Sequence, residues 1–359
     1  MRNKKSDKRI VLTGGGTTGH VAVNLALIPK LLEEGYEIYY MGSKKGIERE
    51  LIEPFKEVKY ESIATGKLRR YLSWENFLDM FRVGAGVFQS IWKIFRIRPN
   101  VIFSKGGFVS VPVLAGAWVN GVPAISHESD LTPGLANKLV QPFVKTLFTT
   151  FPETTRYIKS GKGRFLGPVI RNDLLNGNKQ ALKDRLEIKD DKEILLIMGG
   201  SLGANYLNQM VRDNLDYLLE KYNIIHSCGK GGLAPDIERP GYFQYEYINQ
   251  GLNDVLAASD MVITRSGSNA IFEFLYYKIP MLLIPFEIGS RGDQIDNAKS
   301  FTREGYSIMR MESELDNSSF LSAISELDEK KDKMREAMSS FTFDNNADKI
   351  MDEINRLKK

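Results

Sequence analysis

The segment "TGGGTTGH", residues 13 to 20, combines residue types that suit a ligand-binding turn. It follows the apolar run Ile10–Leu12 and precedes a helical pattern, so we expect it to join a strand to a helix. Glycine permits positive φ angles and close approach of a ligand, and the first N–H groups of a helix attract anions. The segment therefore predicts a turn that binds a phosphate group.

Gly14, Gly16 and Gly19 also match G-x-G-x-x-G, the pattern of dinucleotide-binding turns. An NAD site needs an acid at the end of the second strand, about 20 residues further on, to bind the ribose. That place offers only Ser43, Lys44 and Lys45. NAD is disfavoured, whereas an NADP-dependent oxidoreductase stays open because these groups could bind a 2′-phosphate. The sequence contains no G-x-x-x-x-G-K-[ST], which argues against a P-loop NTPase.

Two further turns carry residues suited to a nucleotide. In "GGSLGA", residues 199 to 204, Ser201 is expected to cap a helix whose N–H groups could bind a diphosphate, although a tight turn with a capping serine is the alternative. In "TRSGSNAIFEF", residues 264 to 274, Glu273 falls about one and a half turns into a helix. Its carboxylate could accept both ribose hydroxyls, and the apolar neighbours favour a largely buried acid over a surface one.

The segment "EIGSRGDQIDNA", residues 287 to 298, follows a predicted strand that ends in proline. Asp293 and Asn297 share a helix face at this spacing, next to Gln294. Amides and carboxylates suit sugar hydroxyls, although Asn297 could equally be an ordinary polar residue of the helix.

Strands and helical patterns alternate along the chain, which indicates an α/β fold. We expect strands at Arg9–Thr13, Glu37–Met41, Val101–Ser104, Ala124–Ser126, Glu193–Met198, Ile224–Cys228, Met261–Thr264 and Met281–Ile284. "KRIVLTGGG" from Lys8 and "KEILLIMGGS" from Lys192 are similar strand-to-turn units. The repetition predicts two doubly wound Rossmann-like domains that face each other across a cleft.

A Gly- and Pro-rich stretch places the linker near Gly163–Gly167. We therefore expect a first domain at 1–165, a second at 166–340, and a segment 341–359 whose helix could pack back on the first domain. Helical patterns cover 318–339 and 346–358.

The single cysteine, Cys228, excludes an internal disulfide and suits a reducing compartment. No signal-peptide pattern precedes the first strand, and the apolar stretch from Phe108 is too short to span a bilayer. The expectation is a soluble cytoplasmic chain.

Residues 67 to 105 hold eight basic side chains against two acidic ones, although the whole chain has a net charge of only +4. Aromatic residues at Phe77, Phe81, Phe88 and Phe95 fall near one helical face, which would ordinarily pack on a sheet. A separate apolar rim with basic neighbours comprises Leu72, Trp74 and Leu78 with Lys67, Arg69 and Arg70. This rim predicts contact with an anionic membrane surface, and we expect no nucleic-acid partner.

The ordered set "GGGTTGH", "SKGGFVSVP", "HESDLTPGLANK", "GPVIR", "GGSLGA", "TRSGSNAIFE" and "DQIDNA" resembles the MurG family of bacterial peptidoglycan glycosyltransferases. The resemblance runs from about residue 9 to about residue 300. It implies a GT-B fold and transfer of N-acetylglucosamine from its UDP conjugate to the muramyl sugar of an undecaprenyl-diphosphate precursor (lipid I to lipid II) at the cytoplasmic face of the membrane. Where many relatives read His-Glu-Gln-Asn, this chain has Ser129 and Asp130 after His127 and Glu128.

The resemblance also implies roles for individual residues. Donor-binding positions are Thr17, Thr18, Gly19, Arg171, Ser201, Ile248, Ser268, Asn269, Ala270, Glu273, Gln294 and Asn297. Among them, Arg171 and Ser201 would contact the diphosphate, Ile248 uracil, Glu273 ribose and Gln294 the sugar. Acceptor-binding positions are Gly14, Gly15, Gly16 and His127.

Glycosyl transfer needs a base for the attacking hydroxyl and stabilisation of the leaving diphosphate. Candidates for the base are His20, His127 and Glu128, with His20 first because its pKa suits neutral pH. The sequence contains no Asp-x-Asp, so we expect no metal and no cofactor. Besides the glycosyltransferase and the NADP oxidoreductase, a non-catalytic binder of nucleotide sugars or lipid diphosphates remains a third interpretation.

Overall fold

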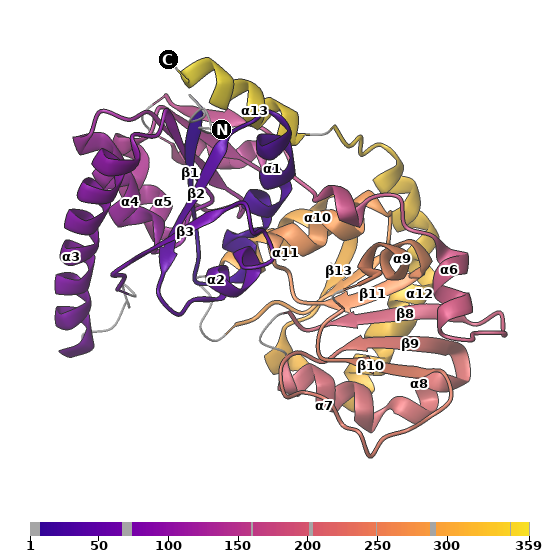
Figure 1. Cartoon of the computed structure of the whole chain (residues 1–359). Coiled ribbons are helices and arrows are strands. Elements are labelled where there is room, and N and C mark those ends of the chain that lie inside the picture. Colours follow the sequence, from indigo (N-terminus) through magenta and orange to yellow (C-terminus); the bar gives the residue numbers. More distant parts are fainter. Residues whose placement is uncertain are drawn as a thin grey trace. The chain divides into compact units, whose positions relative to one another are not determined.

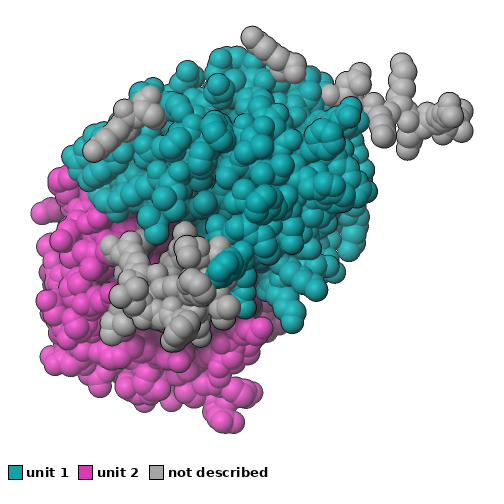
Figure 2. Space-filling view, turned by 90° about the vertical axis from the view of Figure 1, so that its left-hand side faces the viewer, with its two compact units in different colours: residues 1–171, 345–359 teal, residues 172–344 magenta. Residues whose placement is uncertain are grey.

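The computed structural model describes residues 8–66, 74–158, 161–200, 204–248, 250–287, 292–344 and 346–358. The chain divides into two compact units (Figures 1 and 2). Unit 1 comprises Met1–Arg171 and Asn345–Lys359, and unit 2 comprises Asn172–Asp344. Within the described residues, no helix combines the length and apolar character that crossing a bilayer demands.

Unit 1 is built on a parallel sheet with the strand order β3-β2-β1-β4-β5-β6-β7 among the described residues. The strands are β1 Arg9–Thr13, β2 Glu37–Ser43, β3 Lys59–Ile63, β4 Val101–Ser104, β5 Ala124–Glu128, β6 Thr146–Thr149 and β7 Gly163–Phe165. The helices are α1 Ala22–Glu33, α2 Ile47–Ile52, α3 Trp74–Ile97, α4 Ser110–Val119, α5 Leu135–Val140 and α13 Asn346–Leu357.

Alternating side chains of the central strands supply two cores, one on each face of this sheet. Ile10 and Leu12 of β1 pack in the core that includes residues of α1 and α13. Val11 points to the other core, with residues of α3 and α4. Because successive strand residues face opposite sides, a continuous apolar run is what a strand covered on both faces requires.

Unit 2 repeats the plan with the order β10-β9-β8-β11-β12-β13 in the part of the chain that the structure describes. Its strands are β8 Glu193–Met198, β9 Tyr222–Ser227, β10 Tyr242–Tyr245, β11 Met261–Thr264, β12 Met281–Leu283 and β13 Ser307–Met309. Its helices are α6 Lys179–Arg185, α7 Asn205–Asp213, α8 Leu215–Lys221, α9 Leu252–Ala258, α10 Ser268–Tyr276, α11 Asp293–Arg303 and α12 Asn317–Ser339. The two doubly wound domains expected from the sequence are confirmed.

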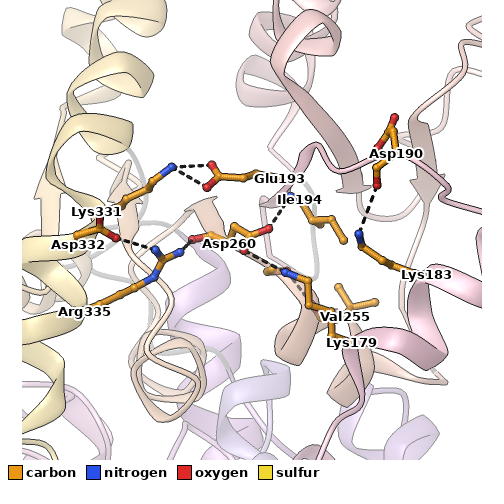
Figure 3. Close-up of polar contacts among 11 residues, drawn as sticks. Lys179, Lys183, Asp190, Glu193, Ile194, Val255, Asp260, Lys331, Asp332 and Arg335 are labelled. Atoms are coloured by element: carbon orange, nitrogen blue, oxygen red, sulfur yellow. Dashed lines mark hydrogen bonds and ion pairs between the residues drawn. The ribbon is translucent and has the colours of Figure 1, made fainter.

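In unit 2, charged side chains fix the amino ends of the two central strands (Figure 3). Asp260, just before β11, accepts the N–H of Ile194 in β8 at 2.9 Å and the Lys179 ammonium at 3.2 Å. Arg335 of α12 donates to the backbone oxygen of Asp260 at 2.9 Å. This network holds β8, β11 and α12 together at the end of the sheet opposite the carboxyl-end turns.

The predicted linker at Gly163–Gly167 is wrong, because Gly163–Phe165 forms the edge strand β7. The N–H groups of Leu166 and Gly167 continue this pairing by donating to the oxygen of Thr149. The two units separate after Arg171.

The chain returns to unit 1 through α13 (Figure 1). Ile350 and Ile354 of α13 lie in the core shared with α1, and Lys30 forms an ion pair with Asp348 at 2.6 Å. Tyr36 donates its hydroxyl to Asn355 at 2.7 Å. The apolar face of α13 is thus buried in unit 1.

Candidate active site

Each unit has a topological switch point, where neighbouring strands lead to helices on opposite faces of the sheet. In unit 1 it lies between β1 and β4, and in unit 2 between β8 and β11. Ligands of doubly wound sheets bind at the carboxyl ends of the strands near this point. The motifs singled out in the sequence follow these strands.

The turn after β1 is shaped by glycine. Gly14 and Gly16 have φ angles of 149° and 92°, which side chains disfavour. The chain then forms a short 3-10 helix, Thr18–His20, before α1. The His20 ring packs on Gly107, where a Cβ atom would lie 3.0 Å from the ring. His20 is partly exposed.

A carboxylate of the protein already occupies part of this turn. Glu48 of α2 is completely buried. Its Oε2 atom accepts the Gly16 N–H at 3.2 Å, and its Oε1 atom accepts the Ser43 N–H and hydroxyl at 2.9 and 2.5 Å. The predicted use of the Gly16 N–H for a phosphate therefore requires correction, because this N–H already donates to the Glu48 side chain.

The turn after β4 contains a buried lysine. Lys105 is 1% exposed, and its ammonium donates to Ser129 Oγ at 2.7 Å. Burial lowers its pKa to about 8, against the opposing effect of Glu128 and Asp130. Lys105 belongs to the basic stretch of residues 67–105, but its ammonium is buried against Ser129 in the segment that follows β5.

The end of β5 carries two of the predicted catalytic or acceptor residues, and both are buried. The Glu128 carboxylate accepts the N–H groups of Asp130 at 3.1 Å and Gly134 at 2.8 Å, and the Asn137 amide at 2.9 Å. These three bonds fix the segment after β5, so Glu128 acts as a structural brace. Burial, followed by the neighbouring Lys105 charge, holds the pKa of His127 well below its usual value.

In unit 2, the turn after β8 differs from its prediction. Gly200 has a φ angle of 90°, and α7 begins only at Asn205. Ala204 precedes it with non-helical angles of −140° and 85°. The predicted cap, Ser201, lies outside the described residues.

The turn after β11 connects three parts of unit 2. Thr264 donates its hydroxyl to Met198 at the end of β8 at 2.9 Å, and Ser266 donates to the backbone oxygen of Gln294 at 2.8 Å. Asn297 is completely buried and donates its amide to Ser266 at 3.1 Å. Asn297 therefore braces the turn, whereas Gln294 is partly exposed at the first turn of α11.

Helix α10 begins at Ser268, as the small-residue turn predicts. Ser268 is buried, whereas Asn269, Ala270 and Glu273 are partly exposed. The first N–H groups of this helix thus lie at the switch point, and Glu273 follows them by one and a half turns. The arrangement suits a diphosphate with an adjoining ribose diol.

The remaining predicted donor residues are spread over both units. Thr17 is exposed, Thr18 and Gly19 are partly exposed, and all three belong to unit 1. Arg171, the last residue of the first stretch of unit 1, and Ile248, which follows β10, are also partly exposed.

Sequence reasoning missed three charged residues that organise these turns, namely Glu48, Lys105 and Arg265. Each is at least 92% buried. A lysine or arginine directly after an apolar strand is the signal that could have identified two of them. Glu48 carries no such signal, because helix α2 resembles an ordinary polar helix in sequence.

Comparison with known proteins gives matches to both halves of the chain. The glycosyltransferase family 28 N-terminal domain matches residues 10–149, and the glycosyltransferase family 28 C-terminal domain matches residues 194–354. The solved structure of Acinetobacter baumannii MurG superposes with a TM-score of 0.76 over 97% of this chain and 99% of that one, at 21% identity, which supports the fold alone.

Two curated relatives bear the name UDP-N-acetylglucosamine–N-acetylmuramyl-(pentapeptide) pyrophosphoryl-undecaprenol N-acetylglucosamine transferase. The one from Geobacillus kaustophilus is 51% identical, over 92% of this chain and 93% of its own. The one from Oceanobacillus iheyensis is 49% identical, over 99% of this chain and 100% of its own. With this identity and both domains matched, the chain belongs to glycosyltransferase family 28 and has the GT-B type of fold.

Proposed function

We propose that the chain is an inverting glycosyltransferase that moves N-acetylglucosamine from UDP-N-acetylglucosamine to the muramyl sugar of a lipid-linked pentapeptide precursor. The observation that carries the proposal is near-complete alignment, at about half identity, with relatives named for this transfer. The partly exposed Glu273 beside the start of α10 supports a UDP-linked donor.

In the proposed reaction, residues of unit 2, together with Arg171 at the end of the first stretch of unit 1, bind the donor. The N–H groups at the start of α10 and the Arg171 guanidinium neutralise the departing diphosphate, Glu273 accepts the ribose hydroxyls, and Ile248 contacts uracil. Gln294 binds hydroxyls of the sugar, and Ser201 contacts the diphosphate. The donor contacts of Thr17, Thr18 and Gly19 stay predictions from the sequence.

His20 is the proposed base that accepts the proton of the attacking muramyl hydroxyl. Attack on the anomeric carbon breaks its bond to the diphosphate, and UDP leaves with the electron pair. Among the candidates for this base, His20 alone is partly exposed, whereas His127 and Glu128 are at least 97% buried. Gly14 and Gly15 remain proposed contacts of the acceptor diphosphate.

The decisive experiment incubates the purified chain with UDP-N-acetylglucosamine and a short-chain lipid-linked muramyl acceptor. We expect UDP release that requires both substrates and persists in excess EDTA. A non-catalytic binder would release no UDP, and loss of activity in EDTA that Mg²⁺ restores would show a metal requirement. Consumption of NADPH without UDP release would favour the oxidoreductase.

We also propose that unit 1 binds an anionic membrane at the cytoplasmic face through α3. The described residues of the aromatic face expected to pack on the sheet are instead exposed, Phe81 by 62%, Phe88 by 76% and Phe95 by 64%. Trp92 of the same helix, which was not part of that prediction, is 58% exposed. The Arg96 and Arg98 guanidinium groups lie 5.5 and 5.9 Å from the centres of the Trp92 and Phe95 rings. Apolar rings beside cations suit an anionic lipid surface.

The rim predicted from the sequence lies outside what the structure describes: Lys67, Arg69, Arg70 and Leu72 are outside it as residues, and Trp74 and Leu78 as side chains. The side chain of Phe77, from the aromatic face, is also outside it. The described face is therefore the better target for a test.

Trp92→Ser with Arg96→Glu should weaken sedimentation with anionic liposomes and leave UDP binding unchanged. Tyr217→Ser with Lys221→Glu is a matched control, because it removes a similar exposed ring and cation from unit 2. Equal liposome binding by both double variants and the unaltered chain would refute the membrane role of this face.

A further inference from the structure

Arg265 opens the turn after β11 and is 8% exposed. Its guanidinium donates to the backbone oxygens of Ile284 at 3.1 Å and Pro285 at 3.4 Å, and forms an ion pair with Glu312. Its central carbon lies 5.4 Å from the centre of the Phe286 ring. These partners offset the cost of burying a cation, so breaking any one of them is unfavourable.

These contacts fix the segment that leads from β12 towards α11. Arg265 holds Ile284, Pro285 and Phe286 from within the unit. The next residue, Glu287, is held by Ser313. The Glu287 carboxylate accepts the Ser313 N–H at 2.8 Å and the Ser313 hydroxyl at 3.0 Å. The segment is thus attached at two points, by Arg265 and through Glu287, and both connect to the turn at Glu312 and Ser313.

The fixed segment orients Gln294. The N–H of Phe286 donates to Gln294 Oε1 at 2.9 Å, and Ser266, next to Arg265, donates to the Gln294 backbone oxygen at 2.8 Å. Because Oε1 accepts a backbone N–H, Nε2 is the end of the side chain that can donate to a ligand. The hydroxyls of a hexose are suitable acceptors.

We infer that Arg265 is a positioning residue for recognition of the donor sugar: it holds Phe286 so that Gln294 presents its amide N–H groups to hexose hydroxyls. The inference rests on the proposed function, in which the donor is a UDP-linked hexose, and assigns sugar selectivity within that site. Arg265 acts through Gln294 and does not contact the substrate. A lysine cannot replace it, because an ammonium lacks the planar fork that spans two carbonyls and a carboxylate.

The test compares Arg265→Lys with Arg310→Lys. Arg310 is a matched control, because it also bonds a backbone oxygen and forms an ion pair in unit 2, with Met309 and Glu326 respectively. In Arg265→Lys we expect the affinity for UDP to stay within about twofold of that of the unaltered chain and the affinity for UDP-N-acetylglucosamine to fall about tenfold. The preference for UDP-N-acetylglucosamine over its 4-epimer, UDP-N-acetylgalactosamine, should also become smaller. The control should change none of these.

A second variant tests whether Arg265 acts through Gln294. In a Gln294→Ala background, Arg265→Lys should cause no further change in the ratio of UDP-N-acetylglucosamine affinity to UDP affinity, because coupled residues are not additive. Equal losses for both ligands, an unchanged epimer preference, or full additivity would overturn the inference. Failure of the proposed function is distinguishable, since the unaltered chain would then release no UDP with the acceptor.

Discussion

Glu273 lies one and a half turns into α10, on the helix whose first N–H groups face the switch point of unit 2. Glu273→Ala should weaken UDP binding, because it removes charge-assisted hydrogen bonds to the ribose, each contributing about 1.5–3 kcal/mol. Calorimetry with UDP and with 2′-deoxy-UDP measures the effect. The 2′-deoxy ligand should bind weakly to the unaltered chain, and Glu220→Ala, an exposed acid of α8, should change neither affinity. Unchanged UDP affinity in folded Glu273→Ala would exclude the ribose role.

His20 and Glu128 were both candidates for the base. Because His20 is partly exposed and Glu128 is buried, we expect their substitution to have different effects. His20→Ala should lower kcat by about 10²-fold with donor affinity little changed. Glu128→Gln should chiefly destabilise unit 1, because the new amide replaces one oxygen of a carboxylate that accepts three hydrogen bonds. The pH dependence of kcat and thermal unfolding distinguish the two. A larger kcat loss in Glu128→Gln than in His20→Ala would reverse the assignment.

For individual residues, the sequence predicts partly exposed polar side chains better than it predicts buried charged ones. Glu273 follows a small-residue turn and Gln294 a polar loop, each after an apolar strand, and this local pattern is the basis on which their roles are predicted. Lys105 and Glu48 are different, because their partners Ser129 and Gly16 lie 24 and 32 residues away along the chain. Pairing of buried charges depends on the fold, which no local pattern encodes.

Among the elements, the turn between β1 and α1 depends on a carboxylate from α2. Glu48→Gln should lower activity and loosen this turn. The new amide N–H₂ group would face the N–H of either Gly16 or Ser43, and that N–H would lose its acceptor. A buried donor without a hydrogen bond costs about 1–3 kcal/mol. Hydrogen exchange at residues 14–20 and acceptor kinetics report the effect. Glu50→Gln, exposed on the same helix, is the control. Slow exchange as in the unaltered chain would mean that the carboxylate does not hold the turn.

The central strands show what apolar runs can predict. β1, β4, β8 and β11 have the expected bounds, because each is a buried run bordered by a turn. Strands β3, β6, β7, β10 and β13 were not predicted. β3, "KYESI", is only partly buried at a sheet edge, and β13 is three residues long, so neither has a distinctive pattern. Helix α3 was predicted, but the aromatic face assigned to the sheet is exposed.

Across the whole molecule, the pH dependence of stability should include one clear contribution from unit 2. His226 is completely buried between Tyr242 and Asn208, each 2.9 Å from a ring nitrogen. Burial, aided by the Arg212 charge, lowers its pKa to about 3. Between about pH 6.5 and 3 the unfolded state binds more protons, so the free energy of unfolding falls with falling pH by up to about 1.4 kcal/mol per unit.

Hydrogen exchange of β9 amides between pH 7 and 5 measures this opening free energy after correction for intrinsic exchange rates. His226→Gln should show a shallower dependence on pH, because its side chain does not titrate. An identical slope in the variant would assign the pH dependence to other groups.

Because α13 completes one of the two cores of unit 1, the one that includes α1, all of unit 2 is inserted between two stretches of chain that form this core. During synthesis, residues 172–344 are complete before the ribosome reaches the helix that covers α1. The apolar residues of α1 that later contact α13 therefore stay uncovered for the whole translation time of unit 2. Unit 2 is contiguous and can fold first, so the order of maturation is the reverse of the order in which the two units begin.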